Sequence, residues 1–189
     1  HFATNIYFKY ILPIFHSGVF SANTFQILLQ NFRTMSVSIA REPINIEALR
    51  RRALHPQAGA VLIFYGDIRN HSEGRDVKAL EYEAHDSMAL KQMNEVADAA
   101  QQRWPLHHVE IIHRLGRMEV MECSIAIAVS TSHRADAYEV SRFIIDTIKR
   151  AVPIWKKEHF SDGNSAWSKG CEAGSVIEAS AEPPPVVQG

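Results

Sequence analysis

The stretch Ser130-Thr-Ser-His-Arg-Ala-Asp-Ala-Tyr-Glu-Val-Ser-Arg-Phe-Ile-Ile-Asp-Thr-Ile-Lys-Arg-Ala-Val-Pro153 decides the fold that the sequence predicts. Its apolar residues recur at the spacing of one helical face, and they are Ala137, Val140, Ile144 and Ile148. The residues 130–132 are of types that cap helix N-termini. Pro153 ends a helix and favours an extended Val152. The stretch therefore predicts an amphipathic helix that directly follows a strand.

Basic residues stand at both ends of this predicted helix. His133 and Arg134 fall in its first turn, where free N–H groups and the helix dipole favour an anion. Lys149 falls in its last turn, and Lys156 and Lys157 follow the proline. Taken singly, each has an ordinary explanation, because lysine complements a helix C-terminus and a basic run is usually a solvated face. Taken together, they predict a pocket for a negatively charged substrate.

The strand before the helix has two unlike sides. Residues 120–129 place Ile125, Ile127 and Val129 on one side. The alternate residues are small, so a helix can pack closely there. Further upstream, residues 59–66 are a continuous apolar run that predicts a buried strand. Arg69 follows that strand and is a second candidate ligand for an anion.

The remaining patterns predict an α+β domain. The expected order is a helix at 43–54, strands at 59–66 and 77–84, a helix at 86–104 capped by Asp86, strands at 109–115 and 120–129, the central helix, and a last short strand at Trp167. Strands and helices in this order favour a mostly antiparallel sheet packed by helices.

Composition narrows the function. The 189 residues carry a formal net charge of -1, so no global field attracts nucleic acid or an anionic membrane. Cys123 and Cys171 lack the spacing of a metal site, and His107, His108 and His113 fall on a predicted strand edge. We therefore expect no metal, no cofactor, and a reducing, cytoplasmic setting.

The ends of the chain differ from its middle. Residues 1–34 contain no acidic residue and do not share the patterns of the rest, so we expect an extension outside the domain. No run of about 18 apolar residues is present to span a bilayer. The domain is expected at 35–170. Residues 171–189 end in a proline run without periodicity, which predicts a disordered tail.

Six short motifs occur in one order between Ile39 and Trp167: Phe64–His71, Leu80–Ala84, Arg103–Pro105, His113–Gly116, Ser132–Arg134 and Lys149–Glu158. In order and spacing they resemble the large, catalytic subunit of molybdopterin synthase. This resemblance implies an α/β hammerhead fold and a sulfurtransferase that converts cyclic pyranopterin monophosphate to molybdopterin. The sulfur would come from the C-terminal glycyl thiocarboxylate of a small ubiquitin-like subunit.

The resemblance also implies an assembly and residue roles. Lys149 matches the family's essential lysine and Lys156 its second active-site lysine, while Lys157 and Glu158 match residues that contact substrate. The family's large subunits form a central homodimer with one small subunit at each outer end, a heterotetramer, and each pocket is completed by the second large subunit. In this chain Arg69, His133 and Arg134 are the candidates to hold the substrate phosphate.

Two other functions compete with this one. The first is a non-catalytic module that binds a ubiquitin-like partner or a phosphorylated metabolite; binding alone would not need both lysines together with the phosphate ligands. The second is a single-strand nucleic-acid binder, suggested by Trp104 and Trp155. The near-zero net charge and the lack of a basic stripe between aromatic residues argue against it.

Overall fold

The computed structural model describes residues 35–168. The extension expected at 1–34 and the tail expected at 171–189 lie outside these residues, as does Cys171, and the domain limits stay predictions. In the described part of the chain, no helix is both long enough and apolar enough to cross a membrane.

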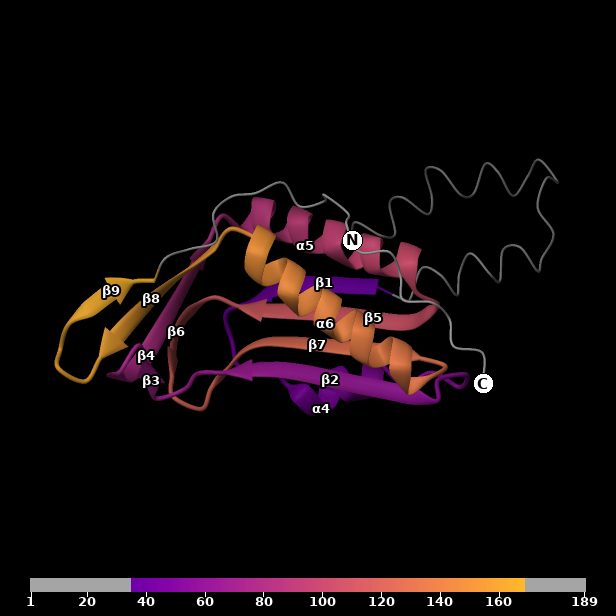
Figure 1. Ribbon diagram of the computed structural model, residues 1–189, viewed down its shortest axis with the longest axis horizontal. Coiled ribbons are helices and arrows are strands. Elements are labelled where there is room, and N and C mark those ends of the chain that lie inside the picture. Colours follow the sequence, from indigo (N-terminus) through magenta and orange to yellow (C-terminus); the bar gives the residue numbers. More distant parts are fainter. Residues whose placement is uncertain (1–34, 169–189) are drawn as a thin grey trace. The chain divides into compact units, whose positions relative to one another are not determined.

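Two sheets form the frame of the domain (Figure 1). The first has the order β1 (Met35–Ala40), β5 (Leu106–Arg114), β7 (Cys123–Thr131) and β2 (Ala60–Asp67). The second has the order β3 (His71–Ser72), β4 (Arg75–Ala84), β8 (Ile154–Phe160) and β9 (Ser165–Trp167), with β6 (Gly116–Glu119) also paired to β4. Every pairing is antiparallel except that of β1 with β5. The predicted α+β class with a mostly antiparallel sheet is confirmed.

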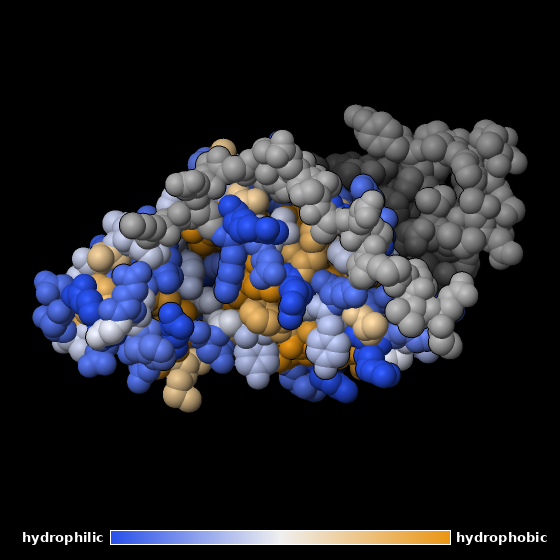
Figure 2. Space-filling view, in the orientation of Figure 1, coloured by the Kyte–Doolittle hydropathy of each residue, from blue (hydrophilic) through white to orange (hydrophobic). Residues whose placement is uncertain are grey.

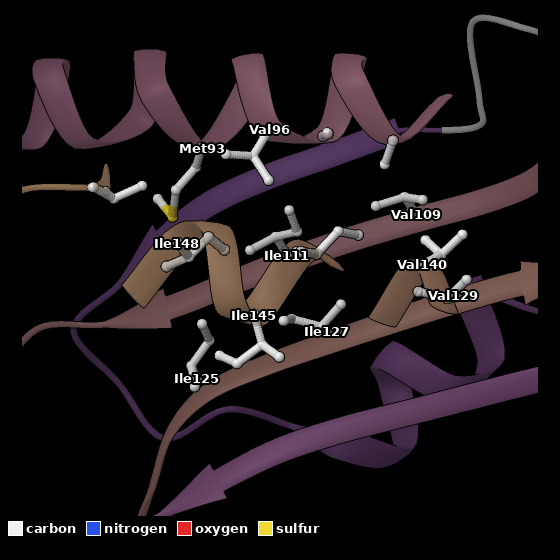
Figure 3. Packing of buried hydrophobic residues seen from close by; sticks show 14 of the residues in the cluster. Met93, Val96, Val109, Ile111, Ile125, Ile127, Val129, Val140, Ile145 and Ile148 are labelled. Carbon is white, nitrogen blue, oxygen red and sulfur yellow. The ribbon is translucent and has the colours of Figure 1, made fainter. Parts of the chain in front are cut away.

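Three helices of residues 35–168 cover the first sheet. Helices α5 (Asp86–Arg103) and α6 (Arg134–Ala151) pack on one face, and α4 (Ile46–Arg52) packs on the other (Figure 1). The bulky residues of β7 and β5 meet both long helices in the main core (Figure 3). The small residues Ala126 and Ala128 lie under Leu49 of α4, as their side of the strand predicted.

Helix α6 has the predicted extent but not the predicted cap. Its N-cap is His133, with extended backbone and no capping hydrogen bond from its side chain. Ser130 and Thr131 belong to β7 instead. At the other end Val152 is extended before the proline, as predicted. Asp86 likewise is not a cap; it lies in the first turn of α5, where its carboxylate is 2.8 Å from the Nη2 atom of Arg41.

Two other predictions about strands were wrong. The run 59–66 forms β2, but among the described strands β2 lies at an edge of its sheet. Its apolar side chains are only half-buried, and Tyr65 is 51% exposed. The histidines 107, 108 and 113 belong to β5, which lies between β1 and β7 rather than at an edge, and His108 and His113 are buried. Strands β1, β3, β6 and β8 were not predicted.

Two turns have left-handed backbone at residues other than glycine. Glu73 (φ 48°) and Gly74 (φ 78°) join β3 to β4 in a two-residue hairpin of the type that needs positive φ at both positions. Met121 (φ 74°) lies between β6 and β7 and is 84% exposed. The second turn matters for the site, because its backbone bonds to the segment that carries Arg69.

Candidate active site

A lysine–glutamate pair lies on the inner face of the second sheet. Side chains alternate along a strand, so Lys156 and Glu158 of β8 share one face. The Nζ atom of Lys156 lies 2.9 Å from Oε1 of Glu158, and Ser72 Oγ donates a 3.0 Å hydrogen bond to the same oxygen. Glu158 is only 8% exposed. The hairpin before β4 and the strand after α6 thus meet at one carboxylate.

The surroundings of Glu158 favour its ionised form. Burial acts to raise the pKa of Glu158. Hydrogen bonds from Lys156 and Ser72, with the charges of Lys156 and Arg69, outweigh burial, so the net pKa is lowered. Glu158 is therefore a carboxylate at neutral pH, and it faces two cations.

Arg69 is held beside this pair by the backbone before it. The N–H of the buried Ile68 donates to the carbonyl of Glu122 (3.0 Å), and its carbonyl accepts from the N–H of Met121 (2.8 Å). These bonds fix the chain just after β2, while the Arg69 side chain itself is exposed. The structure therefore brings Arg69 together with Lys156 and Glu158, whereas the sequence had grouped Arg69 with His133 and Arg134.

Tyr82 and His113 form an uncharged wall next to the pair. Tyr82 lies opposite Lys156 in the β4–β8 pairing, and its ring meets that of His113 edge-on, with centroids 5.4 Å apart. Burial lowers the pKa of His113 to about 4, so it is neutral at neutral pH. Burial also raises the pKa of Tyr82. Neither residue was predicted to belong to the site. Leu80, Tyr82 and Ala84 alternate with Glu81 and Glu83, a pattern that places Tyr82 on the apolar face of a strand.

Lys149 lies at the same end of the domain. It is exposed in the last turn of α6, and only Val152 and Pro153 separate that helix from β8. Arg69 and Lys156 lie beside the Glu158 carboxylate, and Lys149 is on the helix that leads into the same strand. Within residues 35–168, no three His, Cys, Asp or Glu side chains are arranged to hold a metal ion. The charges suit a small anionic substrate.

The other candidate residues lie elsewhere in a single chain. Lys157 points to the opposite face of β8 from Lys156, and its Nζ lies 5.7 Å from the centroid of the Trp167 ring. His133 and Arg134 are exposed at the start of α6. At 1.5 Å per residue, Arg134 is about 22 Å along the helix axis from Lys149. One chain alone does not bring the two ends of α6 to one substrate.

The family follows from comparison with known proteins. A family model described as MoaE protein matches residues 39–151. The chain belongs to the MoaE family. The molybdopterin synthase catalytic subunit of Halalkalibacterium halodurans is 46% identical over 126 residues, which are 67% of this chain and 81% of that protein. The human catalytic subunit is 39% identical over 131 residues, 69% of each chain.

Solved structures agree with this membership. Molybdopterin synthase from Staphylococcus aureus has a TM-score of 0.65 at 38% identity, covering 69% of this chain and 95% of that one. A complex of subunits 1 and 2 of molybdopterin-converting factor from Helicobacter pylori has a TM-score of 0.60 at 18% identity, which shows the fold alone. The resemblance is therefore confirmed, and the chain is an enzyme: a MoaE catalytic subunit of molybdenum cofactor biosynthesis.

Proposed function

We propose that this MoaE chain converts cyclic pyranopterin monophosphate to molybdopterin. The sulfur comes from the C-terminal glycyl thiocarboxylate of a small ubiquitin-like subunit. The observation that carries the proposal is the cluster of Arg69, Lys156 and Glu158 beside the helix end that bears Lys149. The two-subunit complex from Helicobacter pylori, which shares this fold, supports a small protein partner.

The roles follow from charge. Lys149 stabilises the negative charge that develops as the thiocarboxylate is consumed, or carries a proton in that step. Lys156 acts beside it, held by Glu158 at 2.9 Å. Arg69 binds the substrate phosphate by charge-assisted hydrogen bonds. Because Lys157 faces away from this cluster, we assign it to the rim of the site at most.

The surface between α6 and β2 supports a homodimer. A groove there is lined by Leu62, Phe64, Tyr138, Arg142 and Ile145, among others. Tyr138 is 67% exposed, and β2 leaves one edge of its sheet unpaired within residues 35–168. Figure 2 shows apolar residues among polar ones on the face that carries α6. A second copy of the chain would cover this apolar edge.

A two-fold axis at this surface explains the separation of the candidate residues. If α6 packs antiparallel to its copy about its own midpoint, near Arg142, the first turn of one helix meets the last turn of the other. The partner subunit's His133 and Arg134 then lie beside this chain's Lys149. Each dimer would contain two complete sites, both shared between subunits, and His133 and Arg134 would bind the substrate phosphate from across the axis.

The proposed reaction is tested by reconstitution. The full chain is mixed with a thiocarboxylated small subunit and cyclic pyranopterin monophosphate, and the dithiolene product is measured. We expect product from the wild-type chain and almost none from Lys149→Ala. Tight binding of both partners without any product would instead favour the non-catalytic binding module.

A further inference from the structure

Strand β5 contains a β-bulge at His107. Leu106 pairs with Thr131 and His108 pairs with Ser130, so His107 is an extra residue without its own partner on β7. A bulge changes the direction of the side chain at which it occurs, and bulges are frequent beside active sites. Here the bulge lies where β7 ends and the chain turns into α6.

The bulge directs His107 toward two neighbours. Its ring stacks on that of His55, with centroids 4.6 Å apart and an interplanar angle of 7°. Its Nε2 atom lies 2.9 Å from Oγ of Ser132. Burial lowers the pKa of His107, and the charge of His55 lowers it by a smaller amount. The ring is therefore neutral at neutral pH. Each tautomer of a neutral ring can hydrogen-bond a hydroxyl group at Nε2.

The segment that His107 reaches is also held from other directions. Gly59 lies so close that an added Cβ would meet the carbonyl oxygen of Ser132. Thr131 Oγ1 donates a 2.8 Å hydrogen bond to the carbonyl of His133. These contacts are needed because His133 makes no capping bond with its own side chain. The backbone at the start of α6 is therefore fixed from outside the helix.

This backbone sets where the proposed phosphate ligands point. Among residues 35–168, the side chains of His133 and Arg134 have no hydrogen-bond or ion-pair partner that would orient them. Their directions consequently depend on how the chain leaves Ser132. A change in the Ser132 backbone would move both ligands together. Lys149 is at the opposite end of α6, so this change would not move it directly.

We propose that His107 is a positioning residue for the phosphate-binding part of the active site, acting through Ser132 on His133 and Arg134. The inference rests on the proposed function, because it assumes that these two side chains bind the substrate phosphate. His107 does not itself contact the substrate. Losing the hydrogen bond would therefore weaken substrate binding without slowing the sulfur transfer that follows.

The test separates the hydrogen bond from the ring stack. His107→Phe keeps the ring against His55 but cannot bond Ser132, whereas His107→Gln has an amide near the place of Nε2. Ser132→Ala removes the hydroxyl with little change in shape. His55→Phe is the matched control, because it keeps the stack and leaves the bond to Ser132 intact.

We expect His107→Phe and Ser132→Ala each to raise KM for cyclic pyranopterin monophosphate about fivefold, the value of one neutral hydrogen bond, with kcat unchanged. The double variant should show no further rise, because both changes break one interaction. His107→Gln should restore most of the wild-type KM, and His55→Phe should keep it.

Three kinetic results would overturn the inference. One is an unchanged KM in both His107→Phe and Ser132→Ala. Another is an equal rise in KM, with a lowered melting temperature, in all four single variants, including the control His55→Phe. That result would mean a general packing role. A third is a fall in kcat without a rise in KM.

A calorimetric titration of the same pterin into the chain without its small subunit keeps the two proposals apart. A fivefold higher Kd for the pterin in His107→Phe supports the inference, whether or not the wild-type chain forms product. A wild-type chain that binds the pterin but forms no product would count only against the proposed reaction. Equal Kd values in an active enzyme would remove the inference and leave the reaction standing. A wild-type chain that does not bind the pterin would remove both.

Discussion

Lys156 and Glu158 lie two residues apart on one face of β8, with Nζ of the lysine 2.9 Å from Oε1 of the glutamate. Because Ser72 bonds the same oxygen from the β3–β4 hairpin, the carboxylate is a fixed counterion rather than a mobile surface group. It holds a lysine that projects from a strand at the place where the substrate is expected.

Glu158→Gln should therefore lower turnover while preserving the fold. The amide can still accept from Ser72 but cannot hold Lys156 by charge. One charge-assisted hydrogen bond is typically worth about 1.5–3 kcal/mol, which corresponds to roughly a ten- to hundredfold change in rate. Steady-state kinetics check this, with Ser72→Ala as the control that keeps both charges. Equal kinetics in wild type and Glu158→Gln would show that the pair is only structural.

Variants at the two ends of α6 should fail in different ways. Lys149→Ala should reduce turnover on the order of a hundred- to a thousandfold, the usual effect of removing one electrostatic stabiliser. Arg134→Ala should mainly weaken pterin binding, by about 1.5–3 kcal/mol. Kinetics at saturating pterin distinguish the two. Near-normal turnover in Lys149→Ala, or a loss of turnover without loss of affinity in Arg134→Ala, would contradict these roles.

The same two variants can show whether a site is shared between subunits. If it is, a dimer of one Lys149→Ala chain and one Arg134→Ala chain has one intact site and one doubly altered site. Random re-pairing of equal amounts should then recover roughly a quarter of the wild-type activity, since half of the dimers are mixed. Light scattering verifies that dimers form. Sites built within one chain would give no recovery.

Adjacent arginines on α4 should differ in their effect on stability. Arg52 binds the buried carboxylate of Glu110 with three contacts of 2.7 to 3.0 Å, whereas Arg51 pairs with the exposed Glu47. Arg52→Ala should lower the free energy of unfolding by about 1–2 kcal/mol, less than for a fully buried pair because the arginine is half exposed. Arg51→Ala should cost at most about 0.5 kcal/mol. Urea denaturation measures both.

The effect at Arg52 should depend on pH. Burial acts to raise the pKa of Glu110, but hydrogen bonds and charge from His108 and Arg52 lower it below its ordinary value. A carboxyl group whose pKa falls on folding stabilises the protein above its unfolded pKa of about 4.3, and this stabilisation is lost as pH falls through the folded pKa. The difference in free energy of unfolding between wild type and Arg52→Ala should therefore be largest at pH 7 and should decrease in acid. A difference that increases in acid would contradict this prediction.

Met121→Gly should stabilise the domain. At φ 74° the methionine has a backbone conformation that costs an ordinary residue about 1 kcal/mol or more, and at 84% exposure its side chain contributes little packing. The extra freedom of glycine in the unfolded chain offsets part of this gain. Met121→Ala is the control, since it shortens the side chain but keeps the strain. Equal melting temperatures in the two variants would show that backbone strain is not the cause.

The sequence predicted the elements whose signals are local. Apolar spacing and Pro153 placed α6, and the small residues on one side of 120–129 predicted a helix packed closely against that side of β7. Strand β8 was missed because residues 156–158 form a charged run shortly after a proline. Its strand conformation comes from pairing with β4, a contact between residues far apart in the sequence.

The sequence named candidate site residues, but their arrangement required the structure. Arg69 lies beside Lys156 and Glu158, whereas the sequence had grouped it with His133 and Arg134. The opposite direction of Lys157 follows from strand alternation, which could be applied only once β8 was known. The length of the predicted helix was enough to show that His133 and Lys149 are far apart in one chain. The bulge that directs His107 to Ser132 depends on the β5–β7 register, which no pattern within β5 reveals.

The parallel pairing of β1 with β5 sets an order for folding. Met35 pairs with Val109, about 70 residues later in the chain, so closing this loop costs more entropy than any hairpin of the domain. On the ribosome β1 emerges early, yet its partner strand is made only after β2, β4 and α5. We expect β1 to dock late and to slow refolding, although among the strands of residues 35–168 it is synthesised first.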